Sequence, residues 1–130
     1  MDTRKPLLPV ADLIRSYTRQ TELYRKLYEC VQTVYSRLVL SRGNLQNVMG
    51  ILEDKQRLMQ HISEERARIQ ESSDVWLREK DAAAKTPETE RLNEILAGTE
   101  NAIRDFLGIE QQLELYLQRL VEKENGKSHD

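Results

Sequence analysis

Few residues in this 130-residue sequence have the types and spacing that catalysis or metal binding requires. The two histidines, His61 and His129, lie far apart in the chain and do not form a pair with metal-ligand spacing. In an antiparallel hairpin that turns near residue 43, Cys30 has no histidine beside it, so a buried structural thiol is its expected role. The sequence therefore predicts neither a catalytic residue nor a metal site.

The glycines and the acidic residues add no further site. The five glycines are dispersed along the chain and form no phosphate-binding loop. Adjacent carboxylates, such as Glu53 with Asp54 and Glu64 with Glu65, diverge on a helix, and Glu64 is expected to form an ordinary i,i+4 surface pair with Arg68. We therefore predict a protein that is not an enzyme, has no cofactor and acts through a surface that binds another protein.

The composition narrows the class of partner and the location. Lys and Arg number 20 against 22 Asp and Glu, so the chain has no strong net field to attract nucleic acid. A single cysteine excludes an intrachain disulfide, and the N-terminal segment lacks the apolar core of a signal peptide. The apolar runs are also too short for a membrane span. We expect a cytoplasmic protein that binds neither nucleic acid nor the membrane interior.

The apolar residues recur in steps of three and four, which predicts long amphipathic helices. A first helix over residues 10–42 carries a heptad seam, with further apolar positions beside it that favour a third helix in the core. Four tyrosines lie along this stripe, either as core and rim residues or as a strip that binds a partner. These tyrosines are Tyr17, Tyr24, Tyr28 and Tyr35.

A turn at Gly43 separates this helix from a second one over residues 44–83. Gly43 is predicted to adopt a left-handed backbone that ends the first helix, and Asn44 to cap the next. Ser72, Ser73 and Asp74 can each cap a helix, so the sequence leaves open whether the second helix breaks at residues 72–74. The hairpin would place Trp76 near Val10, where it either plugs the end of the bundle or contacts a partner.

The motif Thr86-Pro87-Glu88 predicts the start of a third helix over residues 87–123. Residues 1–8 are expected to form a loose arm and residues 124–130 a solvated tail. The predicted fold is therefore all-α and a single domain: an elongated antiparallel three-helix bundle, made of a long helical hairpin and a C-terminal amphipathic helix.

The apolar arc of the third helix is wider than packing on one hairpin requires, so part of it should remain available to a partner. The predicted partner-binding residues are Ile95, Leu107, Ile109, Tyr116 and Val121. The residues predicted to be mostly buried in the core are Ile14, Tyr24, Val31, Leu38, Leu52, Ile62, Phe106 and Leu113.

The segment from Thr21 to Ile69, under half of the chain, resembles the FlgN and FliT-like flagellar export chaperones. The resembling features are a Leu- and Tyr-rich helix, a turn at Gly43-Asn44-Leu45 and a second helix. The whole segment reads TELYRKLYECVQTVYSRLVLSRGNLQNVMGILEDKQRLMQHISEERARI. The second helix carries Leu52, Lys55, Leu58 and Ile62, followed by charged residues.

The resemblance implies a cytoplasmic chaperone that binds an amphipathic chain end of a hook-associated or filament-cap protein and keeps it unpolymerised. It also implies that the client is delivered to a type III export apparatus, so a component of that apparatus would be a second partner. The client would be contacted through the C-terminal helix. The alternative is a helical adaptor or accessory subunit unrelated to flagella. A spacer resembling one spectrin-type repeat fits less well, because a spacer needs no surplus apolar surface. The sequence leaves open the client and the choice between a monomer and a homodimer.

Overall fold

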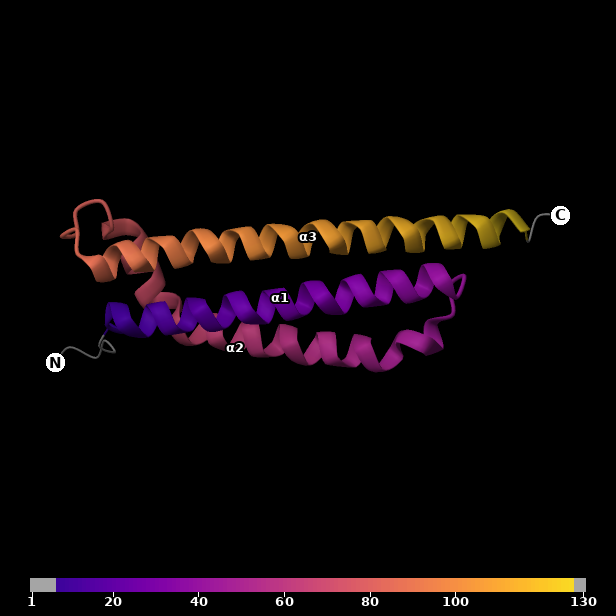
Figure 1. The fold of residues 1–130 in the computed structure, drawn as a ribbon, viewed down its shortest axis with the longest axis horizontal. Helices are drawn as coiled ribbons and strands as arrows, with labels where there is room; N and C mark the ends of the chain where they lie inside the picture. Colours follow the sequence, from indigo (N-terminus) through magenta and orange to yellow (C-terminus); the bar gives the residue numbers. More distant parts are fainter. Residues whose placement is uncertain (1–6, 128–130) are drawn as a thin grey trace.

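The computed structural model describes residues 7–127 and shows three long helices and one short 3-10 helix over that range. Helix α1 spans Val10–Leu40, η1 spans Leu45–Val48, α2 spans Met49–Glu79 and α3 spans Pro87–Lys127. No strand occurs among the described residues. The helices run up, down and up along one long axis, with α1 between α2 and α3 (Figure 1). The predicted all-α helical bundle is confirmed.

The turn between α1 and η1 follows the predicted local signals. Arg42 and Gly43 both have positive φ angles, of 57° and 92°, and the Gly43 N–H donates to the Leu38 carbonyl oxygen at 2.8 Å. This is the pattern that closes a helix with left-handed residues. Because the helix closes this way, α1 ends at Leu40, two residues before the predicted end at residue 42.

Helix α2 is shorter than predicted and continuous. The Asn44 side chain accepts from the Gln46 N–H at 3.1 Å and caps η1, so the α-helix itself begins only at Met49 and ends at Glu79. The helix does not break at residues 72–74, where the serines are buried. Ser72 Oγ accepts from the Leu8 N–H at 2.9 Å, and Ser73 Oγ hydrogen-bonds to the Tyr17 hydroxyl. These serines connect α2 to the rest of the chain instead of capping a helix.

Helix α3 begins where predicted but ends later. The Thr89 N–H donates to Thr86 Oγ1 at 3.1 Å and the Thr86 N–H donates to Thr89 Oγ1 at 2.9 Å, a reciprocal cap just before Pro87. The helix continues to Lys127, so the predicted end at residue 123 is too early. The part of the predicted tail within residues 124–127 is helical, and residues 128–130 lie outside the described range.

The predicted loose arm also needs correction at its inner end. Leu8 is half-buried, its N–H bonds to Ser72, and its side chain packs on the apolar cluster at this end of the bundle. Residues 1–6 of the predicted arm lie outside the described range.

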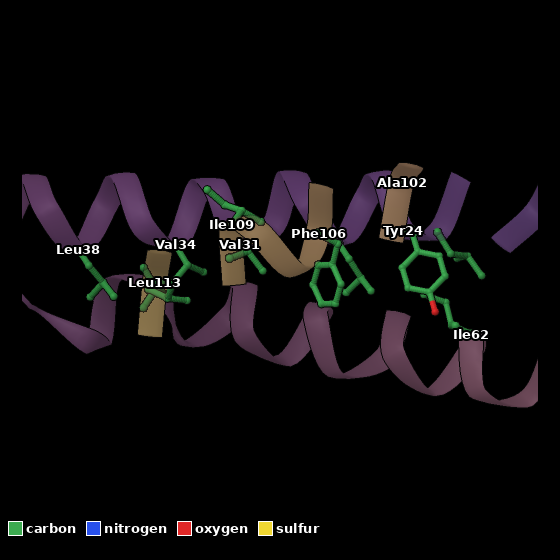
Figure 2. Packing of buried hydrophobic residues seen from close by; sticks show 12 residues of the cluster. Tyr24, Val31, Val34, Leu38, Ile62, Ala102, Phe106, Ile109 and Leu113 are labelled. Carbon is green, nitrogen blue, oxygen red and sulfur yellow. The ribbon is translucent and has the colours of Figure 1, made fainter. Parts of the chain in front are cut away.

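Two apolar clusters form the core. The end cluster is built on Leu13, Ile69 and Leu92, with Val10 and Trp76 packed against it, so the predicted place of Trp76 at the end of the bundle is confirmed. The long cluster fills the rest of the bundle, and Figure 2 shows its side chains reaching between the helices. Its buried residues are Leu23, Tyr24, Leu27, Val31, Val34, Leu38, Val48, Ile62, Ala102, Phe106, Ile109 and Leu113.

Most of the predicted core is buried. Tyr24, Val31, Leu38, Ile62, Phe106 and Leu113 belong to the long cluster. Ile14 and Leu52 are only half-buried, because they pack against the edges of the two clusters. Of the four tyrosines, Tyr24 is buried, whereas Tyr17, Tyr28 and Tyr35 are half-buried against the clusters, which confirms their placement in the core and at its rim.

A polar layer separates the two clusters. Thr21 Oγ1 and Thr99 Oγ1 lie 2.7 Å apart and connect α1 to α3, and Gln20 Nε2 donates to Ser16 Oγ at 3.2 Å within α1. All four residues are buried. Since a buried polar pair is satisfied in only one alignment, we infer that this layer fixes the register of α3 on α1.

Candidate partner-binding surface

The predicted partner-binding residues divide between the core and the surface. Ile109 is only 8% exposed and lies in the long cluster with Val31 and Phe106 (Figure 2). The Tyr116 hydroxyl donates to the Leu38 carbonyl oxygen at 3.1 Å. The prediction that Ile109 and Tyr116 remain available is therefore wrong for Ile109, and Tyr116 is a half-buried contact between α3 and α1.

The other three predicted residues lie further from α1. Ile95 is half-buried, whereas Leu107 and Val121 are 57% and 58% exposed. Leu107 and Val121 are separated by two heptads, about 21 Å along a helix that rises 1.5 Å per residue. Ile109 and Tyr116 lie on the flank of the α3 apolar stripe that faces α1. Leu107 and Val121 lie on the opposite flank of that stripe and therefore point away from α1.

An open face between α2 and α3 provides a more extensive candidate surface. No Cα atom of α2 lies within 8 Å of a Cα atom of α3 in the described chain, although both helices pack on α1. The backbones of α2 and α3 are therefore further apart than either is from that of α1, and side chains such as the Lys55–Glu110 ion pair connect the two helices. A groove of about 290 Å³ lies in the gap, and it continues into a hollow of about 560 Å³ beside the α2–α3 loop.

The walls of this groove are partly apolar. Leu77 comes from α2 and is 50% exposed, while Leu96 and Ile103 come from α3 and are half-buried. Leu107 lies one turn beyond Ile103 on the same side of α3, and Met59, 46% exposed, lies one heptad before the groove residue Arg66 on α2. Sequence periodicity alone did not identify this open face.

The floor of the groove is the polar layer of α1 and its partners. Tyr17, Gln20, Ser73 and Thr99 line the groove, and each of these side chains forms at least one hydrogen bond. Since these polar atoms already have partners within the fold, they do not point to a bound small molecule. The groove can therefore contact a bound molecule mainly through the apolar side chains of its walls.

Charged residues that do not line the groove connect the three helices to one another. Lys55 of α2 forms an ion pair with Glu110 of α3, and both side chains are partly buried. Glu65 of α2 has a pKa lowered from its ordinary value, first by its hydrogen bond to Arg68, whose Nη2 lies 2.6 Å from Glu65 Oε1. A hydrogen bond from Ser16 of α1 also lowers the pKa of Glu65, so this carboxylate links α2 to α1.

The thiol and the imidazole that were considered for catalysis lie between α1 and α2. Cys30 and His61 both line one shallow groove between α1 and α2, so they lie on the same side of the bundle. Burial, followed by the charge of Asp54, raises the pKa of the Cys30 thiol, which disfavours the reactive thiolate. Within residues 7–127, no group of three or more His, Cys, Asp or Glu side chains is placed to bind a metal ion.

Comparisons with protein-family models, with curated proteins and with solved structures give no match for this chain. In the described part of the chain, no helix has the length and apolar character needed to cross a membrane. The arrangement therefore offers an apolar groove between two helices, built on a third helix that supports both.

Proposed function

We propose that this chain is a non-enzymatic, protein-binding chaperone in the cytoplasm. Its client is an amphipathic chain end of a flagellar hook-associated or filament-cap type protein, which it keeps unpolymerised for type III export. The observation that supports this proposal is the groove between α2 and α3, which Leu77 lines, with Leu107 exposed one helical turn beyond the groove residue Ile103. The flagellar part rests on the resemblance of residues 21–69.

An amphipathic client helix fits this face by its shape and its chemistry. Helix-in-groove recognition places one apolar stripe between two helices, with anchors every three or four residues. Leu96 and Ile103 on α3 and Leu77 on α2 offer such contacts from opposite walls. A bound helix would thus add apolar contacts along the groove to those that α2 and α3 already share in the core.

The expected affinity is moderate. A disordered chain end must be ordered when it binds, and this cost lowers the net affinity for a given buried area. The groove also exposes only a few large apolar residues among charged ones. Moderate affinity suits a chaperone, since the client has to be released at the export apparatus.

The test uses two charged substitutions on the same helix. Leu107→Glu introduces a charge on the open face, whereas Leu115→Glu introduces the same charge at another exposed position outside the apolar stripe, where Leu115 is 46% exposed. Burying one leucine contributes about 1.5–3 kcal/mol, so Leu107→Glu should weaken client binding roughly 10- to 150-fold. Leu115→Glu should leave it close to that of the wild type.

Isothermal titration calorimetry with C-terminal peptides of the hook-associated and cap proteins of the same organism measures both affinities, and circular dichroism checks that both variants remain folded. Equal loss of affinity in the two variants would contradict the open face as the site. If none of the peptides binds, the flagellar assignment is wrong. Capture of an unrelated protein that is sensitive to Leu107→Glu would then favour the adaptor.

A further inference from the structure

A second hollow lies at the opposite end of the bundle from the α2–α3 loop. It lies between the C-terminal end of α1 and the last turns of α3 and has a volume of about 610 Å³. Figure 1 shows this end, where the turn after α1 approaches α3. We call it the tip groove, and the residues that its chemistry depends on are Val39, Arg42, Tyr116, Arg119, Leu120 and Lys123.

The tip groove is held in shape by contacts between the turn and α3. A Cβ atom at Gly43 would lie 3.0 Å from Leu120 Cδ1, so the turn backbone rests closely against that side chain. The Tyr116 ring packs edge-on against Tyr35 with a centroid distance of 5.7 Å, and its hydroxyl bonds to Leu38. The groove is thus preorganised, which lowers the cost of binding.

Its chemistry is an apolar floor with a basic rim. Val39 is 45% exposed, and Tyr116 and Leu120 are half-buried beside it. Arg42, Arg119 and Lys123 are exposed around these apolar groups, and no described carboxylate lies within ion-pairing distance of any of the three. These three cations have no acidic partner within residues 7–125 and are therefore available to pair with charges on another molecule.

We propose that the tip groove binds an acidic amphipathic segment of a partner protein. Apolar side chains of the segment would contact Val39 and Tyr116, and its carboxylates would pair with Arg42, Arg119 and Lys123. Arginine suits this role because its planar guanidinium can bind a carboxylate through two hydrogen bonds.

A protein segment fits the tip better than an anionic membrane does. Recognition of anionic lipids generally uses clusters of about four to eight basic residues. The tip groove has three cations, and the carboxylate of Glu124 also lines it. Glu124 would be repelled by a lipid surface of like charge, whereas a peptide can place a neutral or basic residue opposite it.

This binding goes beyond the proposed chaperone function and does not depend on it. The tip groove and the open face between α2 and α3 share no lining residue. A variant can therefore lose one activity and retain the other.

The test uses the full chain and two synthetic helical peptides. Both carry Leu and Phe along one face, and the remaining positions are Glu in one peptide and Lys in the other. Titration followed by amide NMR should show that the Glu peptide binds, with shifts at Val39, Arg42 and Lys123, and that the Lys peptide does not. Added salt should weaken the binding.

The double variant Arg119→Glu/Lys123→Glu should reduce affinity for the Glu peptide about tenfold, because two charge pairs become repulsive. Its matched control, Arg91→Glu/Arg104→Glu, makes the same charge change at exposed positions of α3 that do not line the tip groove, and should bind within about twofold of wild type.

Several outcomes would overturn the proposal. These are an absence of Glu-peptide binding, equal binding of the two peptides, or equal losses in the two double variants. Binding to phosphatidylglycerol vesicles that the Glu peptide does not displace would assign the tip groove to a membrane surface instead.

Discussion

Alanine at Gly43 and alanine at Gly108 should change the free energy of unfolding in opposite directions. Gly43 has a φ of 92°, a region that residues with a Cβ atom rarely occupy. A left-handed backbone costs a non-glycine residue about 1–2 kcal/mol. The added methyl would also lie 3.0 Å from Leu120 Cδ1, but this is the end of a flexible side chain that can move. We therefore expect Gly43→Ala to destabilise the protein by about 1–2 kcal/mol.

Gly108 is the matched control because the same methyl group is added in open space. It lies within α3, and a Cβ atom built there has no heavy atom within 4 Å, apart from its own neighbours and the local helix backbone. Alanine loses less conformational entropy in a helix than glycine does. Gly108→Ala should therefore stabilise the protein by about 0.5–1 kcal/mol.

Urea denaturation followed by circular dichroism measures both changes. Thermal melts should agree, at about 3–5 °C per kcal/mol for a domain of this size. A stabilised Gly43→Ala variant would show that this turn does not need a left-handed glycine. A destabilised Gly108→Ala variant would show that the exposed side of α3 is covered in solution, for example by a second copy of the chain.

Three further predictions concern the core, acid stability and the thiol. Ile62→Ala should lower the free energy of unfolding, measured by urea denaturation, by about 2–5 kcal/mol because Ile62 is 4% exposed. Leu52→Ala should lower it less because Leu52 is half-buried, and equal losses would contradict the observed packing. The lowered pKa of Glu65 means that its stabilising contribution is present above its ordinary value of 4.5 and is lost as pH falls through the lower folded value. The stability advantage of wild type over Glu65→Gln should thus shrink in acid denaturation series below about pH 4.5, and a constant difference would exclude this role. Cys30 should react with iodoacetamide more slowly than glutathione does at neutral pH, and Asp54→Asn should speed the reaction, because the Asp54 charge raises the thiol pKa; an unchanged rate would contradict that cause.

Local sequence signals predicted the starts of α1 and α3 and the turn at Gly43, because these features depend on a few neighbouring residues. Pro9 precedes Val10 at the start of α1, Thr86 caps α3, and Gly43 adopts the left-handed backbone. The helix ends were less accurate, since a helix continues or stops according to contacts that lie far away in the sequence. The buried serines of α2 show the same limit, because a cap and a cross-helix hydrogen bond require the same residue type.

The partner-binding prediction failed at Ile109 for a geometric reason. Periodicity shows that α3 has an apolar stripe, but it does not show which flank of the stripe faces α1. The structure places Ile109 and Tyr116 on that flank and leaves Leu107 exposed on the other. The gap between α2 and α3 is equally invisible in the sequence, because it depends on all three helices lying with α1 in the middle. The relation of Cys30 to His61 depended in turn on the register of α2 along α1.

The central position of α1 has a consequence for the order in which the fold opens. Because the backbones of α2 and α3 each pack on α1 and nowhere come within 8 Å of each other in the described chain, either outer helix can detach while the other stays packed on α1. Such detachment breaks the side-chain contacts that the two outer helices share, including the Lys55–Glu110 ion pair. Native-state hydrogen exchange reports such partial opening residue by residue. Amides around Leu27 and Val31, the buried middle of α1, should therefore exchange last, and the two outer helices should show separate, lower protection.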